Sequence, residues 1–244
     1  MMEDAVVDVK NISMCFNLYK EKIDNIKEYI IKLSQGKLHF EEFWALKNIS
    51  FHLEKGDSLG IIGKNGSGKS TLLKLLSRVM KPTEGIVEVQ GDIAPLIELG
   101  AGFDYDLTAR ENIFLNGAIL GYSNKYMREN FDEIIEFSEL ENFVDVPMKN
   151  FSSGMVARLG FAISTMHQSD ILIVDEILSV GDFKFRMKCE QRLQLMLSKG
   201  TILLLVSHDS TQIEQLCNKA LWLDGGIIRE YGDSAYVCKD YAVL

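Results

Sequence analysis

Residues Gly63–Ser70 read GKNGSGKS and have the spacing Gly-x4-Gly-Lys-Ser. The glycines allow the backbone to curve, so that successive N–H groups point inward around a phosphate chain. Lys69 then brings a positive charge to the β and γ phosphates, and the Ser70 hydroxyl offers a ligand for Mg²⁺. The pattern predicts a nucleoside triphosphate site, here called the phosphate cradle, made of Gly63, Lys64, Asn65, Gly66, Ser67, Gly68, Lys69, Ser70 and Thr71.

Two carboxylates, Asp175 and Glu176, directly follow the apolar run Ile171–Val174. Such a run is typical of a strand buried on both faces of a parallel sheet, and ligands lie beyond the carboxyl ends of these strands. We expect Asp175 to hold Mg²⁺ through water. We expect Glu176 to accept a proton from the attacking water or to orient that water. These roles predict hydrolysis at the phosphate cradle.

A further polar pair, Ser207-His208, ends a second run of this type at Thr201–Val206. Its position predicts that His208 hydrogen-bonds a γ-phosphate oxygen and senses whether that phosphate is present. The remaining histidines lack such a setting and are interpreted as structural or solvent-facing: His39, His52 and His167.

A second turn with anion-binding character lies in the stretch FSSGMVARLGFA, residues 151–162. A Ser-Ser-Gly turn before a helix presents backbone N–H groups to a phosphate-sized anion. The chain already has a better cradle far upstream, so these residues alone do not say what the second turn binds.

The elements around these residues predict an α/β fold. Asp57–Ile62 is an apolar strand before the cradle, and Ser70–Met80 has helical apolar spacing and stops before Pro82. The charged segment 123–155 is helical by pattern. The C-terminal stretch indicates a hairpin at Asp224–Gly226 and then a short last helix.

Composition excludes several other classes of function. The 244 residues carry a net charge of −9, and 47% of them are hydrophobic, enough for a large core. An acidic chain without a basic block is a poor candidate for binding nucleic acid or anionic lipid. The sequence shows no membrane span and no signal-peptide core, so we expect a cytosolic chain. The scattered cysteines are interpreted as reduced thiols in or near the core: Cys15, Cys189, Cys217 and Cys238.

With these motifs in this order, the chain resembles the nucleotide-binding subunit of an ATP-binding-cassette (ABC) transporter. The resemblance rests on the cradle, FSSGM, ILIVDE, the SVGD that follows and SH at 207–208. It implies an ATPase with ATP and Mg²⁺ bound. It also implies a P-loop fold with a mostly parallel core sheet, an antiparallel β subdomain and a helical signature subdomain at about 100–160. Residues 1–244 would form a single nucleotide-binding domain.

The resemblance also gives the second turn a role. In the family, this signature loop grips the γ-phosphate held by the other subunit of a head-to-tail dimer. Carried over, Ser152, Ser153 and Gly154 complete the site of a second copy of the chain, although Phe151 and Met155 depart from the family pattern and Ser153 replaces its glycine. The family's D-loop at the dimer interface would comprise Ser179, Gly181 and Asp182.

Two family positions are less sharply defined here. The Q-loop normally supplies a Gln near Mg²⁺, and that place falls on Glu98 or Leu99. Glu98 is the favoured candidate, either as a metal ligand or as a bystander. The family also stacks adenine on an aromatic residue after the first strand. Phe16 matches that offset better than Tyr19 does.

An insertion at 17–43 separates the first two strands. Its apolar positions have helical spacing and end at Gly36: Ile23, Ile26, Ile30 and Leu33. This helix either packs on its own domain or lies against a membrane partner.

Together with FWALKNISF and LIELGAGF, the insertion resembles the branch of ATPases that export lipid-linked polysaccharides. That branch implies a multi-span permease partner, a peripheral place at the cytoplasmic face of the membrane, and a lipid-linked glycan handled through the permease. The groove near the Q-loop would receive the permease's coupling helix. We expect no C-terminal carbohydrate-binding domain of the kind that some members carry.

Two alternatives stay open at this point. Another class of ABC transporter would share all of this chemistry. A soluble ABC ATPase of translation or DNA repair fits less well, because the chain has one cassette and too short a segment between Lys69 and Asp175 for a long coiled coil.

Overall fold

The computed structural model describes residues 5–19, 40–96, 100, 102–175, 182–207 and 209–243. The strands are β1 (Ala5–Tyr19), β2 (Phe40–Glu54), β3 (Ser58–Ile62), β4 (Glu84–Val89), β5 (Ile93–Leu96), β6 (Ile171–Asp175), β7 (Ile202–Val206), β8 (Lys219–Asp224) and β9 (Ile227–Asp233). The helices are α2 (Lys69–Leu76), α3 (Ala109–Ile119), α4 (Asn124–Glu129), α5 (Phe131–Ser138), α6 (Ser153–Ser164), α7 (Phe183–Ser198), α8 (Ser210–Leu216) and α9 (Ser234–Ala242).

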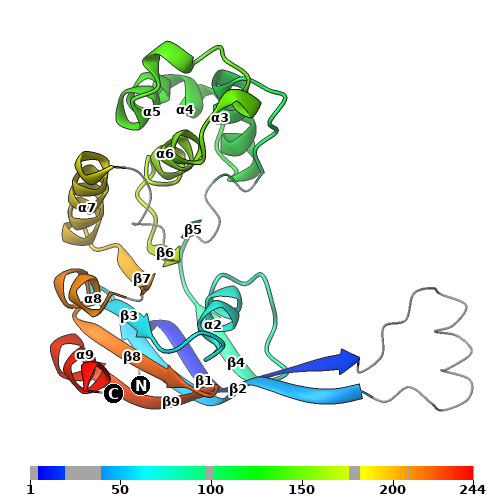
Figure 1. The fold of residues 1–244 in the computed structure, drawn as a ribbon, viewed down its shortest axis with the longest axis vertical. Coiled ribbons are helices and arrows are strands. Elements are labelled where there is room, and N and C mark those ends of the chain that lie inside the picture. Colours follow the sequence, from blue (N-terminus) through cyan, green and yellow to red (C-terminus); the bar gives the residue numbers. More distant parts are fainter. Residues whose placement is uncertain are drawn as a thin grey trace, which may run out of the picture.

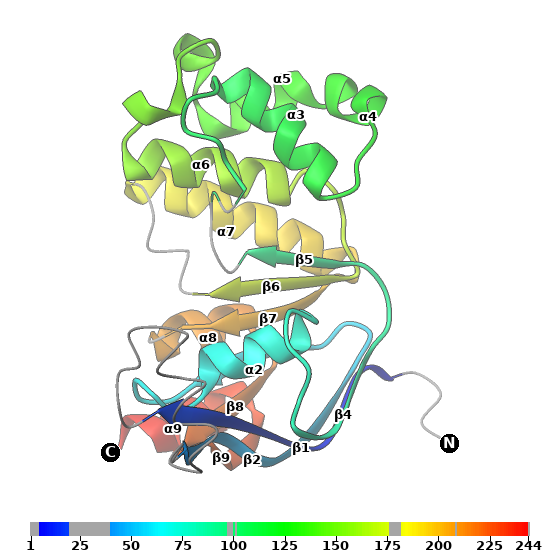
Figure 2. The ribbon, with the colours of Figure 1, turned by 90° about the vertical axis from the view of Figure 1, so that its right-hand side faces the viewer.

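The core sheet has the order β5-β6-β7-β3-β8-β9. All of its neighbouring strands are parallel except β8 and β9, which form an antiparallel hairpin. Strands β3 and β7 are buried along their whole length, as their apolar sequences require. Because β3, β6 and β7 are parallel, the loop after β3 and the end of β6 lie at the same edge of the sheet (Figures 1 and 2).

The second sheet is antiparallel and has the order β2-β1-β4. It packs with α2 against one face of the core sheet. Alternate residues of β6 show how the core is divided, because successive side chains of a strand point to opposite faces. Ile171 and Ile173 belong to the apolar cluster shared with α2 and the antiparallel sheet, whereas Leu172 and Val174 belong to the cluster shared with the other helices.

Helices α3 to α6 lie between β5 and β6 in the sequence and form the upper part of the molecule in Figures 1 and 2. Their buried side chains, such as Ile113, Ile134 and Phe161, join the same core cluster as Leu172 of β6. Thr108 and Glu111 form a capping box that fixes where α3 begins. The predicted fold class is therefore confirmed: an α/β fold with a mostly parallel sheet, an antiparallel sheet and a helical part.

Two predicted boundaries change in the structure. The helix after the cradle ends at Leu76 rather than near Met80, and Arg78 follows with a left-handed backbone, φ 59°. The insertion predicted at 17–43 is strand at both ends, because Asn17 of β1 pairs with Glu42 of β2 and Leu18 with Glu41. The apolar positions of the proposed helix lie outside the described residues: Ile23, Ile26, Ile30 and Leu33.

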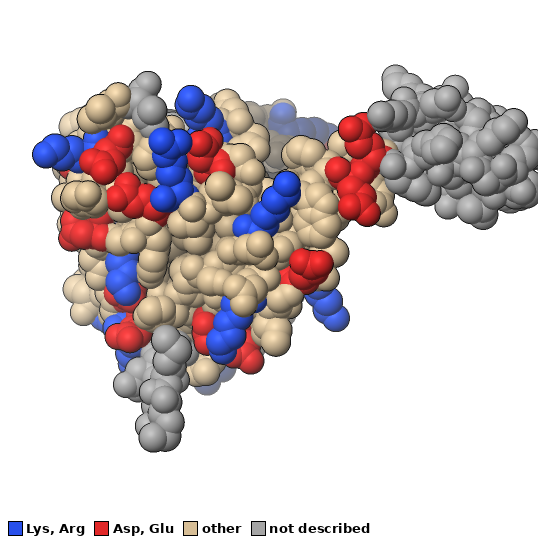
Figure 3. Space-filling view, turned by 90° about the horizontal axis from the view of Figure 1, so that it is seen from below, with Lys and Arg blue, Asp and Glu red and all other residues tan. Residues whose placement is uncertain are grey.

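The C-terminal hairpin and last helix are confirmed as β8, β9 and α9, with Gly225 and Gly226 at positive φ in the turn. The cysteines are free thiols, buried except for the half-buried Cys15. Among the described residues, no helix is both long and apolar enough to cross a membrane. Seen from below, the described surface carries interspersed acidic and basic side chains (Figure 3).

Candidate nucleotide-binding site

The phosphate cradle has the geometry that its sequence predicts. It runs from the end of β3 at Ile62 into α2, which begins at Lys69. Gly68 occupies the N-cap with φ 106°, a conformation that side-chain-bearing residues rarely adopt. A Cβ added there would lie 2.7 Å from the Ala45 carbonyl oxygen and from the Leu46 side chain. Only glycine therefore allows this turn to lie against β2.

Lys69 is buried in the cradle and closes over it. Its Nζ donates to the carbonyl oxygens of Gly63, at 2.7 Å, and of Lys64, at 3.1 Å. These carbonyls hold the ammonium group over the loop, at the place where a phosphate needs a counter-charge. The turn between β8 and β9 also contacts the cradle, because the Gly226 N–H donates to Ser67 O at 3.1 Å.

The cradle has features that fit a phosphate chain. The Ser67 hydroxyl is buried and has no hydrogen-bond partner among the described residues. A cavity of about 250 Å³ opens beside the loop and is lined by Asn65, Gly66, Ser70 and Thr71, among others. Backbone N–H groups, a hydroxyl ligand and an ammonium group therefore converge on one cavity at a helix N-terminus.

Asp175 is the last residue of β6 and pairs with Val206 at the end of β7. It is half-buried at the same sheet edge as the cradle, where an oxygen ligand for Mg²⁺ would be needed. Ser207, the residue after β7, is buried, and its Oγ accepts from the N–H of Asp209 at 3.0 Å. The following predicted site residues lie outside the described part of the chain, so their roles stay predictions: Glu98, Leu99, Glu176, Ser179, Gly181 and His208.

The sequence analysis did not predict that Phe43 forms an aromatic side of the cradle cavity. Phe43 of β2 lines the cavity and is 48% exposed. Phe16, the predicted adenine partner, is directly opposite Phe43 in the β1–β2 pair and packs partly against the core cluster. Residues opposed in an antiparallel pair lie on the same face, so Phe16 stands beside Phe43. Tyr19 ends β1, opposite Phe40.

The second turn, Ser152–Gly154, is called the signature turn here. Ser152 is the N-cap of α6, and its Oγ accepts from the N–H of Met155 at 3.2 Å. Ser152 and Ser153 are exposed, so the N–H groups that begin α6, apart from the Met155 N–H that bonds to Ser152, lie at an exposed turn. Figures 1 and 2 place α6 in the helical part of the molecule, apart from α2 and its own cradle. The signature turn is therefore available to a second molecule.

Asp182 links the start of α7 to the helix of the signature turn. It is the N-cap of α7, and its Oδ1 accepts from the N–H of Phe185 at 2.9 Å. Its Oδ2 accepts from Arg158 at 2.8 Å, and the same guanidinium also pairs with Glu139 at 2.7 Å. The Phe185 N–H and, after it, the Arg158 charge hold the pKa of the Asp182 carboxyl below its usual value.

A strand–glycine loop–helix cradle on a mostly parallel sheet, with a helical part inserted between β5 and β6, defines a P-loop nucleotide-binding cassette. The comparison with known proteins identifies the family. The sequence profile described as ABC transporter matches residues 46–179, so the chain belongs to the ABC transporter family of cassette proteins.

Several curated relatives match the chain over nearly its whole length. The chain is 38% identical over 240 residues to the O-antigen export system ATP-binding protein RfbB of Klebsiella pneumoniae, covering 98% of both chains. It is 46% identical over 243 residues to the protein of the same name from Myxococcus xanthus, where it spans 55% of that longer chain. It is 40% identical to the teichoic acids export ATP-binding protein TagH of Bacillus cereus, of which it spans 42%.

Solved structures support the fold independently. A dimeric, post-hydrolysis form of the ATP-binding cassette MJ0796 bound to ADP and Pi superposes with a TM-score of 0.74 over 93% of this chain and 98% of that one, at 22% identity. The structure of an ATP-binding subunit of an ABC transporter gives a TM-score of 0.76 over 98% of this chain and 94% of that one, at 20% identity. At these identities the likeness concerns the fold.

Proposed function

We propose that the chain is the ATP-hydrolysing motor subunit of an ABC exporter that moves a lipid-linked polysaccharide across the cytoplasmic membrane. The observation that carries the proposal is the cradle itself, with the Lys69 ammonium held over a glycine loop that leads into α2. The family and the names of the relatives supply the transport context, since they include both O-antigen and teichoic acid export proteins.

ATP binding is assigned to residues that the structure describes. The cradle would hold the triphosphate, with Lys69 on the β and γ phosphates, and Phe43 with Phe16 would stack on the adenine. Ser70 and Asp175 have the oxygen chemistry that Mg²⁺ requires, and Glu98 is a further candidate ligand from the sequence. When bound, the ion neutralises charge that develops on the phosphates.

Hydrolysis is assigned to residues known from the sequence alone. Glu176 follows Asp175 and would orient or deprotonate the attacking water, and His208 would contact the γ-phosphate. Both follow strands that end at the cradle edge of the sheet, which supports this assignment.

The working form is proposed to be a homodimer in which each signature turn completes the partner's cradle. The exposed turn at Ser152–Gly154 supports this arrangement, because its N–H groups suit an anion that a second chain brings. Asp182, with Ser179 and Gly181 from the sequence, would lie at the contact between the two copies.

The remaining partner is a multi-span membrane permease, and the motor would sit at its cytoplasmic face. The cargo class is a cell-surface glycan on a lipid carrier, an O-antigen or a teichoic acid, as the names of the relatives suggest. The runner-up is the motor of another ABC transporter class, which would use the same cradle.

The test is to co-express the chain with the membrane protein encoded beside its gene. A stable complex, whose ATPase activity requires Glu176 and which brings the polysaccharide to the cell surface, is expected. A complex that hydrolyses ATP while the surface polysaccharide is unchanged would favour the runner-up. If the isolated chain is fully active and binds no membrane protein, the export proposal is wrong.

A further inference from the structure

A second cavity lies at the opposite end of the core sheet from the cradle. Its volume is about 310 Å³, and its wall includes Asp92, just before β5, and Ser169, shortly before β6. Because β5 and β6 run parallel to β3, the amino ends of these strands lie at the edge away from the cradle. The nucleotide chemistry proposed above makes no use of this cavity.

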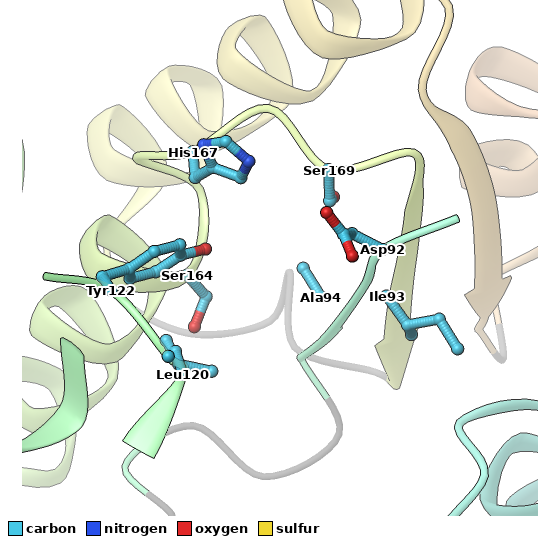
Figure 4. A pocket seen from close by; sticks show the side chains of 9 residues that line it. Asp92, Ile93, Ala94, Leu120, Tyr122, Ser164, His167 and Ser169 are labelled. Atoms are coloured by element: carbon cyan, nitrogen blue, oxygen red, sulfur yellow. The ribbon is translucent and has the colours of Figure 1, made fainter. Parts of the chain in front are cut away.

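One wall of this cavity is acidic and carries an unpaired hydroxyl. The Ser169 side chain is only 4% exposed, and its Oγ has no hydrogen-bond partner among the described residues. An unpaired buried hydroxyl is costly, because its lost hydration is not replaced. The exposed carboxylate of Asp92 lies on the same side of the cavity as Ser169 in Figure 4, and the Asp92 backbone N–H donates to the Asp170 carboxylate.

The facing wall is aromatic. Tyr122 and His167 lie on the other side of the cavity in Figure 4, with ring centroids 5.5 Å apart. His167 is held in place by Tyr126, whose hydroxyl lies 3.3 Å from Nδ1. The hydroxyl of Ser164 and the small, buried side chain of Ala94 also line the cavity. His167, which the sequence suggested to be merely structural or solvent-facing, therefore lines a polar cavity.

The charge of the lining selects the ligand. Among the described lining residues there is a carboxylate but no Lys or Arg, so an anion would be repelled and a cation attracted. Burial, and after it the neighbouring Tyr126 and Asp92, raises the pKa of the Tyr122 hydroxyl, so this group stays neutral. The described residues contain no cluster of three metal-binding side chains, which argues against a metal ion. An organic cation can use the acceptors together with the aromatic faces.

We propose that this cavity binds an ammonium or guanidinium group, with Asp92 and Ser169 as acceptors and the Tyr122 ring against the cation. The cation is either a lysine or arginine side chain of a bound protein or a free small amine. The site is separate from the cradle, so the proposal stands whether or not the export function is correct.

The first measurement follows the His167 ring resonances of the full-length protein by NMR during titration with N-acetyl-arginine amide. N-acetyl-citrulline amide, which has the same shape without the charge, is the matched control probe. A saturable shift with the arginine probe alone is expected. Asp92→Asn should weaken binding about tenfold or more, and Ser169→Ala by about fivefold. Glu141→Gln, at an exposed site in a different segment, should change nothing.

Thermal stability, ATPase activity and formation of the membrane complex test whether this site is independent of the cradle. Ser169→Ala removes a hydroxyl without a partner, so its thermal stability should equal or exceed that of the wild type. The ATPase activity of the isolated Asp92→Asn protein should be unchanged. Loss of the membrane complex in Asp92→Asn would identify a protein side chain as the natural cation, whereas an intact complex with lost probe binding would identify a free amine. The proposal is wrong if both probes bind equally, or if neither the complex nor probe binding responds to Asp92→Asn.

Discussion

Arg158 on α6 donates to Asp182, the N-cap of α7, across 2.8 Å. This contact ties the helix of the signature turn to the start of α7, where the predicted D-loop ends. In the proposed dimer, a movement of either helix would reach the other through a guanidinium that is only 18% exposed. The pair gives a physical link between two motifs that the sequence shows only as separate stretches.

Replacing Asp182 by Ser separates the two roles of this residue. Serine still caps α7, so thermal stability should hold, but the acceptor for Arg158 is lost. We expect kcat for ATP hydrolysis to fall on the order of tenfold, with little change in the KM for ATP. Steady-state kinetics and a melting curve measure both effects. An unchanged kcat would mean that the Asp182–Arg158 contact does not couple the two helices to hydrolysis.

Phe43→Ala should weaken ATP binding without harming the fold. The ring lines the cradle cavity and is half exposed, so its loss removes a stacking surface rather than core packing. Loss of a base–aromatic stack of about 1–3 kcal/mol raises the KM for ATP roughly tenfold. Phe43→Tyr should restore it, and Tyr236→Ala, also exposed but on α9, serves as the control. Equal KM values for Phe43→Ala and wild type would remove Phe43 from the site.

Gly68→Ala should abolish nucleotide binding. The added Cβ would meet Ala45 O and Leu46 at 2.7 Å, at a backbone φ of 106°. The turn that begins α2 would have to move, and the cradle N–H groups would move with it. Gly232→Ala on β9 is the matched control, since no heavy atom of its surroundings lies within 4 Å of the added Cβ. Fluorescent ATP titration compares the two variants, and normal affinity in Gly68→Ala would contradict the described turn.

Stability at acid pH should depend on Asp57, which stands just before β3. Its burial opposes ionisation, but hydrogen bonds from Lys219 and from the Glu54 N–H outweigh this and place its pKa below the usual 3.8. A lowered folded-state pKa contributes stability above the unfolded value, which is lost as the pH falls through the folded value.

The wild type should therefore lose stability more steeply below about pH 4 than Asp57→Asn does. Urea denaturation between pH 3 and 6 tests this expectation. The control variant is Asp224→Asn, at the opposite end of β8 from Lys219. The Asp224 carboxylate pairs with Arg229 in a half-exposed position, so this variant should behave as the wild type does. Parallel pH profiles for wild type and Asp57→Asn would show that the Lys219 pair does not stabilise the fold.

The sequence alone predicted the structural features that depend on consecutive residues. The cradle spacing fixes both the glycine turn and the helix that follows, and the apolar runs before Asp175 and Ser207 identify buried parallel strands. The order of these motifs along the chain also indicated the family correctly.

Features that depend on pairing between distant segments could not be predicted in this way. Phe43 reaches the cradle because β1 and β2 pair in a register that sets it opposite Phe16, on the far side of the insertion. The Arg158–Asp182 contact joins helices on either side of β6. The unpaired Ser169 hydroxyl becomes visible only when α6, β5 and β6 are assembled around the second cavity.

The most direct test of the central claim is the mass of the Glu176→Gln protein with and without ATP, measured by sedimentation velocity. Removing the proposed base should trap the state in which ATP joins two copies. We predict a monomer without ATP, a dimer with ATP, and loss of that dimer when Lys69→Ala is added. A protein that binds ATP and still sediments as a monomer would contradict the proposal that two chains share each nucleotide.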